Sequence, residues 1–190
     1  ELEAIPILES LLLTKENTGA VLLADDVYVH WAAGVDHGLS GIWTQVLLDE
    51  LKKQRRLKHG EYVDCNAKLV GWRYNPIRWD AETALAAFVI AEYDARRYPF
   101  TAILREFASS NLSSKRKSQT ALHLFRLMYH SEIPPIYHGS LVFSVLEAIN
   151  DVWAADRIRM ASQEEFLPYH RMAEDLSRCI QVWDEHRKGF

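Results

Sequence analysis

The sequence lacks several features that define whole classes of protein. It has 190 residues and only 2 cysteines, Cys65 and Cys179, which lie far apart, so it is not a disulfide scaffold. Two free thiols in a reducing compartment are the expectation. The 8 glycines are scattered and form no phosphate-binding loop of the G-x-x-x-x-G-K type. With 48% hydrophobic and 25% charged residues, the composition is that of a globular chain.

Long hydrophobic runs are also missing. The longest apolar stretches, such as 7–13 and 85–91, fall well short of the roughly 20 residues that span a bilayer. No targeting segment is visible, so we expect a cytoplasmic protein with no membrane partner. The formal net charge is −4, from 22 basic and 26 acidic residues, so the molecule is not a polycation. Any contact with nucleic acid therefore has to be local.

Two kinds of pattern are present along the chain. Residues 1–80 alternate short apolar runs with helical periodicity, which favours a parallel sheet with covering helices. We expect strands at 20–24, 39–43 and 77–79, and helices at 2–14, 26–34, 44–57 and 61–73. From residue 81 the pattern is wholly helical, with helices expected near 81–94, 99–109, 117–131, 137–159 and 163–187. No internal repeat is evident, and the order of these helices in space does not follow from the sequence.

These patterns predict an α/β fold that is mostly helical. A short parallel sheet with covering helices is expected in a first domain, 1–80, followed by an all-helical domain, 81–190. The chain begins at Glu1 with no helix-capping residue before it. We therefore suspect that the sequence is a fragment or the tail of a longer protein.

Asp25 and Asp26 are the strongest candidates for chemistry. They follow the apolar run 20–24, at the carboxyl end of an expected strand, where ligand sites of open α/β sheets lie. Magnesium is often held by only one or two protein carboxylates, with water completing its coordination. Helix capping is the alternative, because Asp before a helix commonly caps it. Thr44 is expected to cap the helix over 44–57.

The order of three motifs adds a family resemblance. The chain reads ELEAI at 1–5, LLADD at 22–26 and GLSGIWTQVLL at 38–48. In this order and spacing it resembles the C-terminal half of a PIN domain, a metal-dependent ribonuclease-like fold found in many toxin nucleases. The resemblance covers roughly the first 60 to 80 residues. Nothing in residues 81–190 resembles a known domain.

The resemblance implies a set of site residues. Glu1, or Glu3, matches the family's helix-start acid, and Asp26 matches its strand-end acid, with Asp25 as the alternative. Thr44 matches the small hydroxyl residue that lies near the metal in the family. The family's first acid belongs to a strand that would precede this chain. Either the protein continues upstream, or that part was lost, or the chain is a degenerate relative that only binds.

The resemblance also implies a function. A complete site would bind Mg²⁺ or Mn²⁺ and hydrolyse RNA, less favourably DNA, by metal-assisted attack of water. A regulatory role in bacterial defence or a toxin system follows from the family analogy alone. The alternative is a non-catalytic helical module that docks a protein partner within a larger assembly. In that case the aspartates are helix caps.

Basic clusters offer a second kind of candidate. Lys115, Arg116 and Lys117 lie in the serine-rich stretch 109–119, which we expect to be an exposed loop able to contact phosphates. A plain solvated loop is the alternative. The run KKQRR at 52–56 is better explained as cations that complement a helix dipole. The 8 histidines lack the His-x-x-x-His spacing of a zinc site.

Overall fold

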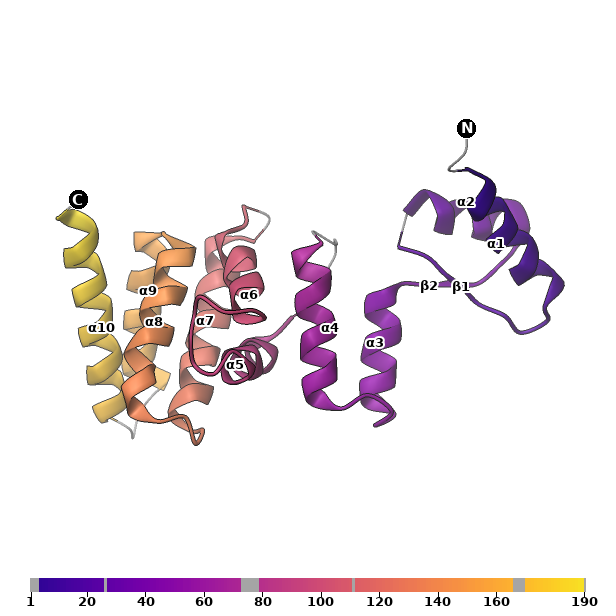
Figure 1. Cartoon of the computed structure of the whole chain (residues 1–190). Coiled ribbons are helices and arrows are strands. Elements are labelled where there is room, and N and C mark those ends of the chain that lie inside the picture. The colour runs from indigo at the N-terminus through magenta and orange to yellow at the C-terminus, as the bar shows by residue number, and fades with distance from the viewer. Residues whose placement is uncertain (1–3, 26, 73–78, 111, 166–169, 190) are drawn as a thin grey trace. The chain divides into compact units, whose positions relative to one another are not determined.

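A computed structural model of the chain describes residues 4–25, 27–72, 79–110, 112–165 and 170–189. These ranges are mostly helical, with ten α-helices, one short 3-10 helix and two short strands (Figure 1). The helices are α1 (Ala4–Glu16), α2 (Val27–His37), α3 (Thr44–Lys53), α4 (His59–Gly71), α5 (Ala81–Ile90), α6 (Phe100–Ala108), α7 (Ser114–Tyr129), η1 (Pro135–Tyr137), α8 (His138–Ile149), α9 (Val152–Glu165) and α10 (His170–Lys188). Within these ranges no helix has the length and apolar character that a membrane crossing needs.

Internal contacts divide the chain into two compact units. The first is Glu1–His59 and the second is Gly60–Phe190. The second unit includes nearly all of helix α4 and the stretch up to residue 80. The sequence pattern groups these residues with the α/β part instead.

The first unit is built on a small parallel sheet. Strand β1 (Leu22–Leu23) pairs with β2 (Gly41–Ile42), with Leu22 opposite Gly41. Helix α1 packs on α2 and β1, and α2 packs on β2. The core is small and consists of Leu11, Leu22 and Ala33, with three partly buried neighbours, Ala24, Val29 and Leu39. This confirms the short parallel sheet near the N-terminus with helices packed on it.

The strand expected at 77–79 does not include Trp79, its described residue. Trp79 belongs to no strand, and residues 77 and 78 lie outside the described ranges. Instead, the Trp79 ring packs edge-on against Phe107, with ring centroids 4.8 Å apart. An aromatic contact of this kind stabilises a core by burial. The side chain thus serves packing within the second unit.

The second unit stacks helical hairpins in two layers. Helices α5, α7 and α9 pack side by side in one layer, and α6, α8 and α10 pack in the other (Figure 1). Each helix of the first layer also packs on the helix that follows it: α5 on α6, α7 on α8, and α9 on α10. The first-layer helices begin at residues 81, 114 and 152, a spacing of 33 and then 38 residues. Stacked hairpins at such a period are the architecture of α-solenoids.

This repeat was missed in the sequence because it is carried by helix placement and not by recurring residues. The core between the layers is apolar and varied, with Phe88, Phe100, Phe107, Phe125 and Trp183 fully buried. Large and small apolar residues can fill equivalent positions when total volume is kept. A structural repeat can therefore persist without a visible sequence repeat.

Several helix boundaries differ from the expected ones. Helix α3 ends at Lys53 and α5 at Ile90, short of the expected 57 and 94, and α9 extends to Glu165, into the helix expected over 163–187. The single helix expected over 137–159 is two helices, because Asn150 adopts the left-handed conformation, with φ 44°, and ends α8. Asparagine tolerates that conformation better than most residues. The stretch 109–119 is only partly a loop, since α7 begins at Ser114. Ser113 caps α7 by accepting a hydrogen bond from the backbone N–H of Arg116 at 3.3 Å.

Candidate functional site

Asp25 and Thr44, two of the predicted site residues, lie together in the first unit. Asp25 follows β1, and Thr44 is the first residue of α3, directly after β2. The backbone N–H of Thr44 donates to Oδ1 of Asp25 at 2.8 Å. The hydroxyl of Thr44 donates to Oδ2 of the same carboxylate at 2.7 Å. The parallel pairing of β1 and β2 brings their carboxyl ends to one edge, so residues 19 apart in sequence meet there.

The contact corrects the expected capping role of Thr44. The N-cap position of α3 is Trp43, whose side chain makes no capping hydrogen bond. Asp25 supplies the capping oxygens from the neighbouring strand end, and Thr44 is a donor to them. A carboxylate at a helix N-terminus is stabilised by the helix dipole and by the N–H groups that have no partner within the helix. The capping alternative for Asp25 is thus realised in α3, the helix that follows the neighbouring strand.

A histidine completes the same edge of the sheet. Nε2 of His30, on α2, lies 2.7 Å from the backbone oxygen of Ala24. The His30 ring stacks on Trp43 with centroids 4.4 Å apart and planes 14° apart. It also lies so close to Gly41 that a Cβ at that position would meet Nδ1 at 2.4 Å. His30 therefore ties α2 to the ends of both strands, a role that the sequence analysis did not anticipate.

The other predicted acids cannot be placed. Glu1, Glu3 and Asp26 lie outside the described residues. Among the residues that are described, no group of three His, Cys, Asp or Glu side chains could hold a metal ion. Asp25 can contribute one carboxylate, and carboxylate oxygens are ligands that Mg²⁺ and Mn²⁺ accept. The donor set therefore fits one part of a magnesium or manganese site, and further ligands have to come from elsewhere.

The basic cluster of the second unit lies at the start of α7. Lys115 and Arg116 are exposed, whereas only 8% of Lys117 is exposed. Lys117 lies near Asp151, whose carboxylate accepts hydrogen bonds from the Ser114 hydroxyl and from the backbone of Trp153. These interactions, that with Ser114 foremost, hold the pKa of Asp151 below its usual range. Lys117 thus faces the joint between α7 and α9, so of the three predicted cations only Lys115 and Arg116 face solvent.

Lys115 borders a groove of this unit. The groove has a volume of about 590 Å³ and lies between the first-layer helices α7 and α9. Lys115, Ser118, Gln119 and Leu122 line it from α7, and Arg157, Ile158, Met160, Ala161 and Glu164 line it from α9. A second hollow continues along α7 past Gln119 and Leu122 to His123 and Arg126. Arg126 and Arg157 were missed in the sequence because they lie 11 and 42 residues from Lys115.

Comparison with known proteins adds no relative: no protein-family model, no curated protein and no solved structure matches this chain.

Proposed function

We propose that the first unit forms one side of a metal-dependent site that cleaves RNA, in a PIN-like nuclease whose remaining acids lie outside this chain. The observation that carries the proposal is the Asp25 carboxylate, held by Thr44 at the edge where both parallel strands end. The order of the motifs points to both residues, and they are in direct contact. Bound Mg²⁺ or Mn²⁺ would activate a water and stabilise the leaving oxygen.

Neighbouring residues of this chain would orient the Asp25 carboxylate. Both carboxylate oxygens of Asp25 accept hydrogen bonds from Thr44, so the plane of the carboxylate is set by α3. The backbone of α3 in turn follows β2, and His30 braces both strand ends through Ala24 and Trp43. Precise placement of ligands by neighbouring hydrogen bonds is a general requirement of metal sites. Asp25 is exposed, so a substrate or a further acid can approach it.

The test is cleavage of a labelled single-stranded RNA by the intact protein that contains this chain, with and without Mn²⁺. Asp25→Asn and Asp26→Asn, singly and together, are compared with Asp36→Asn, which removes an exposed acid of α2 in the same unit. We expect metal-dependent cleavage that falls at least a hundredfold in the double variant and is retained in Asp36→Asn. Cleavage that is indifferent to both aspartates, or absent from the wild-type protein, would overturn the proposal.

A second candidate function is docking of a protein partner without catalysis. The observation that favours it is an exposed apolar stripe on α2, formed by Tyr28, Trp31 and Val35, which are 79%, 61% and 65% exposed. Their spacing of three and four residues places them on one helix face. Patches of this kind mark interaction surfaces. If Trp31→Ser abolishes capture of a partner while Asp25→Asn does not, the docking function is favoured over the nuclease.

A further inference from the structure

Helix α7 is unusual in its charge. Over its 16 residues it carries Lys115, Arg116, Lys117 and Arg126 and no acidic residue, in a chain whose net charge is −4. Lys115, Gln119, Leu122, His123 and Arg126 recur at spacings of three and four, so they share one face of the helix. At 1.5 Å per residue, Lys115 and Arg126 are about 16 Å apart along the axis. The two hollows that these residues line share Gln119 and Leu122 and form one surface.

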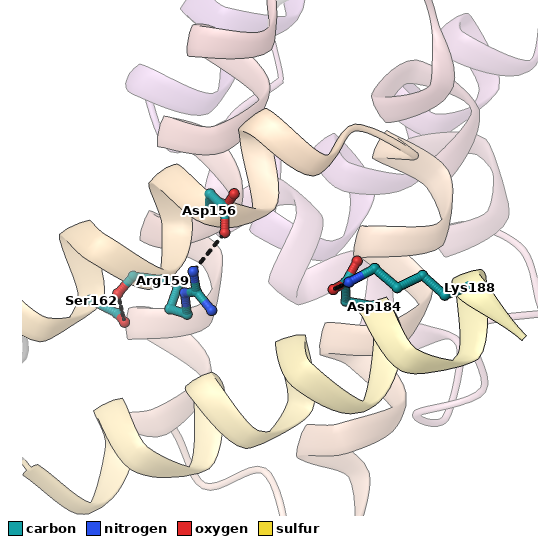
Figure 2. Close-up of polar contacts among 5 residues, drawn as sticks. All are labelled: Asp156, Arg159, Ser162, Asp184 and Lys188. Atoms are coloured by element: carbon teal, nitrogen blue, oxygen red, sulfur yellow. Dashed lines mark hydrogen bonds and ion pairs between the residues drawn. The ribbon is translucent and has the colours of Figure 1, made fainter.

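The cations of this surface lack the ion pairs that other cations of the unit make. On α9, Arg159 is paired with Asp156 at 2.8 Å, and on α10 Lys188 is paired with Asp184 (Figure 2). Arg157, two residues before Arg159, lines the groove on α9 instead. No ion pair is found for Lys115, Arg126 or Arg157 within the described ranges. The groove lining also holds one acid, Glu164, so its unpaired guanidinium and ammonium groups outnumber its carboxylate and favour an anionic ligand.

The start of α7 adds to this charge. Its N-terminus carries partial positive charge and lies beside Lys115. The Ser114 hydroxyl of α7 donates to Asp151, which caps α9 through the backbone N–H groups of Trp153 and Ala154. The groove lining on α9 begins only at Arg157, so Asp151 is not among the residues that line the groove.

The groove also offers contacts for flat apolar groups. Its floor includes the buried side chains of Leu122 and Ile158, and Met160 is 66% exposed at its rim. Trp153 is 77% exposed and lies four residues before Arg157, hence on the same face of α9. Exposed aromatic rings beside cations stack nucleobases while the cations bind phosphates.

We propose that the groove between α7 and α9 binds single-stranded RNA, with Lys115, Arg126 and Arg157 on phosphates and Trp153 stacked on a base. The choice of RNA rests on the proposed nuclease function, for which the groove would hold the substrate strand. An acidic peptide would satisfy the cations but gain little from an exposed indole. Lys117 takes no part, because it is buried against the α7–α9 joint.

Binding is measured by fluorescence anisotropy with a labelled single-stranded RNA of about 12 nucleotides, the scale of a single-strand site. EDTA is present, so cleavage cannot contribute. Lys115→Ala/Arg157→Ala is compared with Arg96→Ala/Arg105→Ala, which removes the same charge from exposed residues of this unit away from the groove. Lys115→Arg/Arg157→Lys keeps the charge, and Trp153→Ala is compared with Trp153→Phe. Circular dichroism checks that each variant is folded.

We expect the groove variant to bind about tenfold more weakly and the control pair to bind like the wild type. The slope of log affinity against log salt should become shallower by about 1.4, the value for two lost phosphate contacts on a single strand. The charge-keeping variant should restore most of the affinity. Trp153→Ala should weaken binding about fivefold, and Trp153→Phe much less.

Several results would overturn the proposal. These are no RNA binding by the wild type, equal loss in the control pair, or displacement of the RNA by an equally charged acidic peptide at the same concentration. The last result would assign the groove to a protein segment. Because Asp25→Asn lies in the other unit and leaves the groove intact, it should bind RNA normally. If the wild-type protein binds RNA but does not cleave it, the proposed nuclease alone is refuted. If the groove variants bind and cleave RNA like the wild type, the proposed RNA groove alone is refuted.

Discussion

The carboxylate of Asp25 accepts both hydrogen bonds that Thr44 can donate, from the backbone N–H at 2.8 Å and from the hydroxyl at 2.7 Å. One acid thus joins the end of β1 to the beginning of α3. The same geometry serves two purposes, because it caps a helix and it fixes the direction of a carboxylate. Substitutions that preserve one purpose and remove the other can separate them.

Replacing Asp25 by Asn should keep most of the cap and lose the charge. The amide oxygen can accept from the Thr44 N–H, and the Thr44 hydroxyl can rotate to accept from the amide NH₂. Asp25→Asn should therefore cost less than about 1 kcal/mol of local stability, whereas Asp25→Ala should cost about 1 to 2 kcal/mol. Amide hydrogen exchange across α3 measures both. Equal protection in the Asn and Ala variants would contradict the capping role.

Gly41→Ala should destabilise the first unit. A Cβ at this position would meet Nδ1 of His30 at 2.4 Å and Cε1 at 2.6 Å. The ring cannot simply move away, since it is stacked on Trp43 and lies 2.7 Å from the Ala24 oxygen. Overpacking of this kind costs about 1 to 3 kcal/mol. The measurement is hydrogen exchange of β1 and α2.

Gly34→Ala is the matched control for that substitution. Gly34 lies within α2, and a Cβ there would meet no atom within 4 Å. Alanine is favoured over glycine inside a helix by about 0.5 to 1 kcal/mol. Protection of α2 should therefore rise in Gly34→Ala and fall in Gly41→Ala. If protection of α2 fell in both variants, the loss would come from adding any side chain to this unit and not from the contact with His30.

Local patterns in the sequence predict most of the helices correctly. Asp80 was expected to precede the helical part, and it caps α5 by accepting from the Thr83 N–H at 2.7 Å. The break at Asn150 was missed, because the apolar spacing continues from α8 into α9 and asparagine is tolerated inside a helix. After this left-handed residue the chain turns into α9, which packs against α7 and α10, and these long-range contacts are not contained in the local sequence.

Residues brought together from distant positions are harder to predict. Asp25 and Thr44 were found through motif order, and their mutual contact follows from the parallel pairing of two short strands. His30 belongs to no recognisable motif, and a lone histidine on a helix can serve many roles. Likewise, Lys115 and Arg157 become neighbours only through the stacking of α7 on α9. A single sequence states which residues are present, but not which helices share a layer.

Acid should weaken the joint between α7 and α9. The Ser114 hydroxyl, foremost, and backbone N–H groups lower the pKa of the Asp151 carboxyl in the folded protein. A lowered pKa means that the unfolded chain takes up the proton first. The stabilisation is therefore present above the ordinary carboxyl value, about 3.9, and is lost as the pH falls through the folded-state value.

The pH effect is measured directly by NMR titration of the Asp151 carboxyl carbon. Ser114→Ala should move its pKa back toward the ordinary value, because the hydrogen bond that lowers this pKa most is removed. Asp151→Ala should lose the α9 cap, at about 1 kcal/mol near neutral pH, and this loss should shrink in acid. An unshifted Asp151 pKa in the wild type would contradict the described contacts.

Cys179 should be slow to alkylate in the folded protein. Burial raises the pKa of its thiol, and the charge of Asp175 raises it further, so less thiolate is present at a given pH. In a Cys65→Ser background, the reaction with iodoacetamide at about pH 8, below the ordinary thiol pKa of about 8.5, should be clearly slower in native buffer than in urea. Asp175→Asn should speed the native reaction, whereas Arg178→Gln should slow it, because Arg178 lowers the thiol pKa. Equal native and unfolded rates would show that α10 does not bury this thiol. A native reaction that is slowed by Asp175→Asn or speeded by Arg178→Gln would refute the electrostatic part alone.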